Sequence, residues 1–83
     1  MRETLIAVQT VNDERGNRYE FSYYRLEEGN SYGICIRDRN GGSAMVPDLT
    51  VSKRKVNVLL KRMIRGAVSP VGMQDIIEDW LIL

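Results

Sequence analysis

The positively charged residues between positions 53 and 65 form the pattern in this sequence that is most suggestive of chemistry. This segment holds six of the twelve Lys and Arg residues of an 83-residue chain whose formal net charge is only +1, and it contains no acidic residue. In a helix, with about 100° per residue, these cations fall opposite the apolar side chains. The candidate binding surface consists of Arg54, Lys55, Lys61, Arg62 and Arg65.

A face of this kind is unfavourable to the helix that carries it. Lys61 and Arg65 are like charges one turn apart, and cations in the first turn oppose the helix dipole. Three interpretations account for it: a solvated face, neutralisation inside the molecule, or contact with the phosphates of RNA or DNA. The acidic residues available for internal neutralisation are Glu27, Glu28, Asp75, Glu78 and Asp79.

The composition gives little indication of a metal site or of a catalytic nucleophile. Asp75, Glu78 and Asp79 share one helix face at spacings i, i+3 and i+4, but one helical turn offers few converging ligands for a hard cation. The chain has no histidine, and its single cysteine, Cys35, can form no internal disulfide. Without a nucleophile–base pair or a cofactor loop, we expect no enzyme activity, no cofactor and no metal site.

The first half of the chain alternates apolar and polar residues with the period of β-strands. Turn residues separate the runs at 12–17, 28–30 and 40–43. We therefore predict a single α+β domain over 1–83, with an antiparallel meander of three or four strands. The strands are expected at about 3–11, 18–27 and 31–38, with a short fourth at 44–47 cut off by a proline.

The second half changes to a helical period, which predicts helices over 53–65 and 70–82. Ser52 is the expected N-cap of the first helix, and Gly66 is the expected C′ glycine after its last turn. The second helix is expected to open at Ser69–Pro70, or near Met73 because Gly72 weakens a first turn.

Both helices are expected to pack on one face of the sheet. That face is predicted to carry Ile6, Val8, Phe21, Ile34 and Ile36. The opposite face is half apolar, which favours a protein contact over full exposure to solvent. Its candidate interface residues are Leu5, Ala7, Tyr24 and Leu26.

Several short strings resemble those of a known family. The residues Val68-Ser69-Pro70, Met73 and Asp75–Leu81 resemble the ending of a family of short uncharacterised proteins from Gram-positive, mostly clostridial, bacteria. Tyr32-Gly33-Ile34 and Ser52-Lys53 are similar to its middle portion. The family is a domain of unknown function, so the resemblance implies the fold outline and a bacterial cytoplasm.

These observations favour a small non-catalytic binding or adaptor protein of the cytoplasm. Its expected partner is another protein or a second copy of the chain, because small domains often gain stability by forming dimers. The alternative is nucleic-acid binding through the helix over 53–65. No membrane role is expected, because no segment approaches the ~20 apolar residues of a span and no signal peptide is recognisable.

Overall fold

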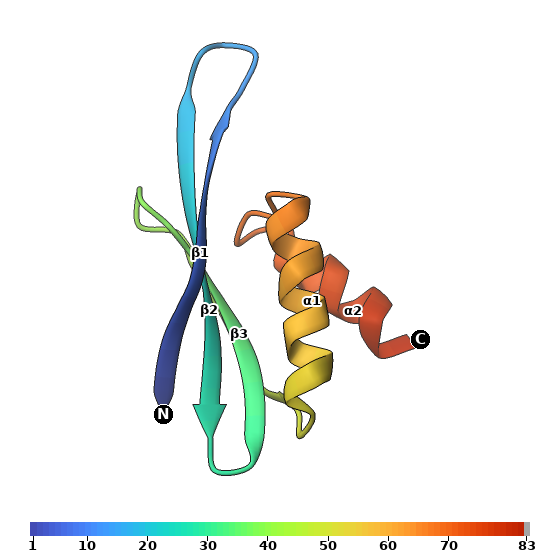
Figure 1. The fold of residues 1–83 in the computed structure, drawn as a ribbon. Helices are drawn as coiled ribbons and strands as arrows, with labels where there is room; N and C mark the ends of the chain where they lie inside the picture. Colours follow the sequence, from blue (N-terminus) through green and yellow to red (C-terminus); the bar gives the residue numbers. More distant parts are fainter. Residues whose placement is uncertain (83) are drawn as a thin grey trace.

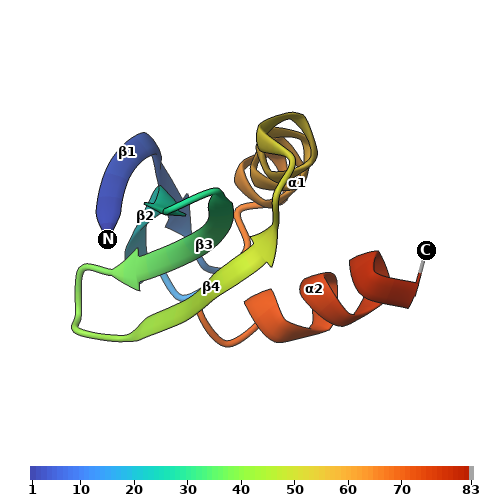
Figure 2. The ribbon, with the colours of Figure 1, turned by 90° about the horizontal axis from the view of Figure 1, so that it is seen from below.

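The computed structural model describes residues 1–82 and confirms an α+β fold. Four antiparallel strands form one meander in the order β1-β2-β3-β4, and two helices follow (Figures 1 and 2); β4 is seen in Figure 2. Both helices lie on the same side of the sheet, as Figure 1 shows. The elements are β1 (Arg2–Asn12), β2 (Arg18–Glu28), β3 (Ser31–Asp38), β4 (Ser43–Thr50), α1 (Lys53–Arg65) and α2 (Met73–Ile82).

The core lies between the sheet and the two helices. Phe21, Ile34 and Ile36 are buried on the helix-covered face, as the alternation predicts. From the helical side, α1 contributes four buried residues and α2 two. The buried helical side chains are Val56, Leu59, Leu60, Met63, Met73 and Ile77.

The two ends of α1 follow from local chemistry, with one correction. The Ser52 hydroxyl accepts a hydrogen bond from the Lys55 backbone N–H at 3.2 Å, as expected of an N-cap. Gly66 is not the C′ residue, because its φ is −84°. Ala67 takes that position with φ 48°, and the Val68 N–H donates to the Met63 carbonyl, which completes a Schellman motif.

The prediction that Ile6 and Val8 lie under the helices is wrong. Leu5 pairs with Tyr24 but Ala7 pairs with Tyr23, so Ile6 is an extra residue in the ladder. Such a bulge inverts the alternation for the rest of the strand. Ile6 and Val8 are therefore exposed, and the residues beside Tyr23 and Phe21 on the helix side are Ala7 and Gln9.

The fourth strand is longer than predicted. It continues past Pro47 to Thr50, whereas the proline was expected to end it near 47. Between the pairs Ile34–Val46 and Tyr32–Thr50 three residues of β4 face one of β3, which is a wide irregularity. Because β4 is an edge strand, its proline removes no hydrogen bond from the interior of the sheet.

The second helix begins at Met73, the later of the two expected starts. Residues 69–72 form a turn, in which the Gly72 N–H donates to both the carbonyl and the hydroxyl of Ser69.

Three side chains of the sheet tie α1 and the loop after it in place. Gln9 Nε2 donates to the carbonyl of Ile64 at 3.0 Å, and Arg25 Nη1 donates to Asn57 Oδ1 at 3.0 Å. The Tyr23 hydroxyl donates to the Val68 carbonyl at 2.9 Å, beyond the end of α1. These contacts set the orientation of the outer face of α1.

Candidate functional site

The outer face of α1 carries two shallow hollows that share Val58. One is lined by Ser52, Arg54, Lys55 and Val58 of α1 and its cap together with Trp80 of α2. The other lies toward the end of α1. We call the combined area the Val58 surface; its members are Arg54, Lys55, Val58, Lys61, Arg62, Arg65 and Trp80.

All five cations of the predicted binding surface line this area. They are exposed, and none forms a salt bridge with any residue of the described part of the chain. Neutralisation inside the molecule, one of the three interpretations of the basic helix, is therefore not observed at salt-bridge distance. The ion pairs within residues 1–82 are Arg2–Glu27, Arg25–Glu27, Arg37–Glu3 and Arg39–Glu20, all of them in the strands or their turns.

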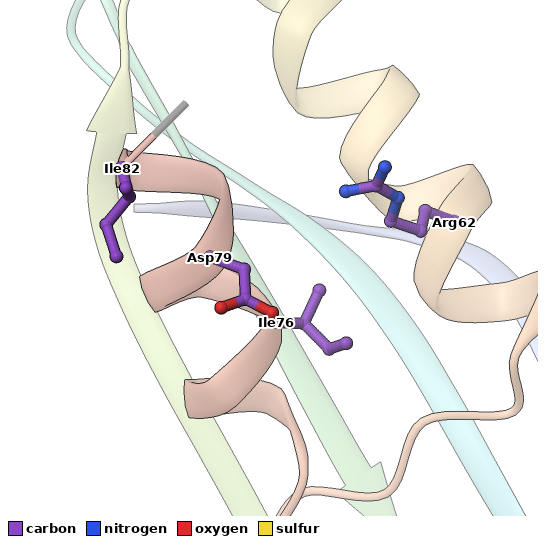
Figure 3. A pocket seen from close by; sticks show the side chains of 4 residues that line it. All are labelled: Arg62, Ile76, Asp79 and Ile82. Carbon is purple, nitrogen blue, oxygen red and sulfur yellow. The ribbon is translucent and has the colours of Figure 1, made fainter.

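A groove between α1 and α2 extends the Val58 surface. Figure 3 shows Arg62 on α1 and, across the groove, Ile76, Asp79 and Ile82 on α2. Asp79 is the acidic residue that lines the same groove as Arg62, yet its carboxylate is not within 4 Å of the Arg62 guanidinium. On the α1 side of the groove, the Arg62 guanidinium is therefore free to contact an anionic group of a partner.

Apolar side chains are exposed in and beside this area. Val58 is 61% exposed and Ile82 84% exposed, while Ile76 and Trp80 are half-buried against the core. A purely solvated helix face has no need of such residues, because their exposure to water is unfavourable. In the sequence, Val58 is an apolar residue among the cations of α1, whereas Ile76 and Trp80 follow the helical spacing of the apolar residues in α2 and are typical of a core-facing stripe.

The open face of the sheet holds a second apolar area. Leu5, Tyr24, Cys35 and Met45 are paired in one row across the four strands. Leu5 is 53% exposed, and Tyr24 is half-buried under the guanidinium of Arg37, whose Cζ lies 4.6 Å from the ring centroid.

Two of the four residues predicted for this sheet-face interface are not exposed on the open face. Ala7 follows the β-bulge and is paired with Tyr23 on the helix-covered side. Leu26 is on the open face by register but is buried. Leu26 is paired with Gly33, and the backbone of β4 at Val46 and Pro47 packs directly against the α-carbon of Gly33. The open face of the sheet is therefore covered beside Leu26.

Cys35 is buried, and that burial raises the pKa of its thiol, although the nearby Arg37 acts in the opposite direction. A thiol that stays protonated is a weak nucleophile.

The acidic residues of α2 do not form a metal site. Within residues 1–82, no three Cys, Asp or Glu side chains converge as metal ligands would, and this includes Asp75, Glu78 and Asp79.

Comparison with known proteins assigns the chain to a family. Its sequence matches the model of a family of unknown function (DUF6514) over residues 2–83, so the chain belongs to that family. No curated protein and no solved structure matches it. Over the described residues, neither helix is long and apolar enough to cross a membrane.

Proposed function

We propose that the protein is a small non-catalytic binding protein, of the adaptor type, that recognises an acidic segment of another protein through the Val58 surface. The observation that supports this proposal is that one face of α1 combines exposed apolar side chains with cations that have no salt bridge within residues 1–82. Partner helices commonly bind in this way, with apolar anchors in a groove and charges at its rim.

The cations supply attraction and the apolar residues supply anchoring. Arg54, Lys61 and Arg65 are exposed and would meet carboxylates of the partner at the rim. Val58 lines both hollows and the half-buried Trp80 lines one of them, and both would be covered by an apolar side chain of the partner. Residues of this kind at the centre of an interface contribute most of its binding energy.

Nucleic-acid binding through the helix over 53–65 is the second candidate, and the same unpaired cations favour it. Phosphate contacts would use the five cations and would make affinity fall steeply with salt. They would leave Val58, Ile76 and Ile82 without a role. We therefore rank the protein partner first.

The family resemblance supports a cytoplasmic setting. From the same resemblance we infer that the lineage is Gram-positive and mostly clostridial.

The test is affinity capture from the native cytosol with and without nuclease, using two matched pairs of variants. Val58→Ser and Val71→Ser each remove an exposed valine, but only the first lies in the Val58 surface. Arg65→Glu and Arg15→Glu each reverse an exposed cation, and Arg15 lies in the turn after β1. The decisive readout is which captured molecule each variant loses.

We expect one protein to be retained after nuclease treatment by wild type, Val71→Ser and Arg15→Glu. Val58→Ser and Arg65→Glu should each reduce its binding about tenfold, which corresponds to about 1.4 kcal/mol. Recovery of nucleic acid that depends on Arg65 but not on Val58 would replace this proposal with the second candidate. Equal capture by all four variants would refute both.

A further inference from the structure

The second helix, α2, carries charge of the opposite sign to α1. It contains no cation, and its three carboxylates, those of Asp75, Glu78 and Asp79, are exposed. None of the three forms a salt bridge with any residue of the described part of the chain. A basic helix and an acidic helix therefore line one groove, and neither neutralises the other at salt-bridge distance.

The C-terminal end of α2 projects from the molecule with apolar side chains uncovered. The buried residues of this helix, Met73 and Ile77, both lie in its first half. Figure 2 shows the other end of α2 extending past α1, away from the sheet. There Leu81 is 63% exposed and Ile82 84% exposed, which is unfavourable in water. We call residues 78–82 the α2 arm.

The spacing of charged and apolar residues on the α2 arm matches the spacing on α1. Ile82 has Glu78 and Asp79 one helical turn before it, at i−4 and i−3. Val58 has cations one turn away on both sides, at i±3 and i±4, namely Arg54, Lys55, Lys61 and Arg62. Contact of Ile82 with Val58 of a second copy therefore places both carboxylates beside cations, whichever way the two helices run.

The charges of the chain favour a second copy in one arrangement. Contact of α1 with α1 of the second copy would oppose six cations to six cations, whereas contact of α2 with α1 of the second copy joins opposite charges. A two-fold axis makes this contact occur twice, so each copy covers both its arm and its Val58 surface. An acidic segment of another protein would cover the Val58 surface and leave the arm exposed.

We propose that the α2 arm of each copy lies on the Val58 surface of a second copy, so that the protein forms a two-fold dimer that masks its own binding surface. The inference rests on the proposed function for the role of that surface and adds its regulation. Because the arm and an acidic partner use the same cations, partner binding and dimer formation exclude each other.

The mass of the purified protein and an exchange of charge between the two helices test the dimer. Wild type should sediment with twice the 9.5 kDa mass of the chain. The arm variant, Glu78→Lys/Asp79→Lys, sets cations against the cations of α1, so its dissociation constant should rise at least about tenfold.

A surface variant should weaken the dimer equally, because it sets carboxylates against the acidic arm. It replaces the cations around Val58 and carries Arg54→Glu, Lys55→Glu, Lys61→Glu and Arg62→Glu. An equimolar mixture of the arm variant and the surface variant should restore a dimer, since each arm then meets a surface of opposite charge.

Matched controls separate this contact from general effects of charge and apolar area. Glu14→Lys/Glu28→Lys reverses two exposed carboxylates outside the helices, with the same change in net charge, and should remain dimeric. Ile82→Ser should weaken the dimer about tenfold, whereas Val71→Ser, at a valine that is 92% exposed, should not. Circular dichroism verifies that each variant is folded.

The failure of this inference is distinguishable from failure of the proposed function. A monomeric wild type, an arm variant as dimeric as wild type, or a mixture of folded variants that stays monomeric would overturn the dimer. These measurements contain no partner, so they leave the capture experiment unaffected. If the dimer masks the Val58 surface, the arm variant should capture more of the acidic partner than wild type; capture of less would refute the masking.

Discussion

Ala67 shows how a single residue carries strain at the end of a helix. It adopts φ 48°, a left-handed conformation that costs an L-residue about 1–2 kcal/mol and glycine almost nothing. The neighbouring glycine, Gly66, sits one position earlier in an ordinary right-handed conformation. The chain thus has its glycine one residue before the position that needs it.

The position of this glycine, one residue before the left-handed site, predicts the effect of two substitutions. Ala67→Gly should raise the free energy of unfolding by about 1 kcal/mol, because it relieves the left-handed strain. Gly66→Ala should be neutral or stabilising, since a methyl group there meets its nearest atoms at 3.5 and 3.6 Å, which is ordinary contact. Urea unfolding of both variants gives the values. Destabilisation by Gly66→Ala would mean that Gly66, not Ala67, is the left-handed residue.

At the scale of elements, β3 and β4 cross closely at Gly33. A methyl group on Gly33 would lie 2.6 Å from the Cα of Pro47, and it would also overlap the carbonyl of Val46. Both neighbours are backbone atoms of the irregular part of β4, so they cannot move as a side chain would. The close approach requires glycine at this position.

Gly33→Ala should therefore destabilise the fold by about 1–3 kcal/mol, the usual range for overpacking. Gly42→Ala is the matched control, because its added methyl group would meet Asp38 Cβ at 3.5 Å without a clash. Thermal unfolding followed by circular dichroism compares the two. If Gly33→Ala melted with wild type while Gly42→Ala did not, the close packing of β4 on β3 would be wrong.

At the scale of the whole molecule, Tyr23 links the sheet to the segment between the helices. Its side chain is fully buried, and its hydroxyl donates to the carbonyl of Val68. Burial raises the pKa of Tyr23 to about 12, because the phenolate would lose its hydration. In the unfolded chain a tyrosine titrates near pH 10.

This difference predicts a loss of stability at alkaline pH. Above about pH 10 the unfolded state releases the proton of Tyr23 and the folded state keeps it, so the free energy of unfolding falls with rising pH up to about pH 12. The slope from this group is at most ~1.4 kcal/mol per pH unit. Tyr23→Phe should be less stable at pH 8, because the Val68 carbonyl loses its donor, and should show a shallower decline above pH 10. An identical decline in both proteins would contradict the assignment.

The distribution of charge also belongs to the whole molecule. Four ion pairs within residues 1–82 lie in the strands and their turns, whereas the outer face of α1 leaves five cations without a salt bridge among the same residues. Long-range attraction to an acidic partner should therefore be directed at α1.

Local patterns in the sequence were sufficient for much of this architecture. The helical period and Ser52 defined α1, and the alternation of Phe21, Ile34 and Ile36 defined the covered face of the inner strands. The concentration of cations in α1 was visible as well. These features depend on neighbours along the chain, so periodicity and capping reveal them directly.

Tertiary structure alone decided the remainder. The bulge at Ile6 moved Val8 to the open face and Ala7 to the helix side, and no local signal marks it, because it depends on pairing with β2. Trp80 reached the Val58 surface only because α2 packs beside α1. Which strand has a free edge was likewise settled by the order of the sheet. Such features depend on contacts between residues distant in the sequence, and the periodicity of a single segment carries no information about them.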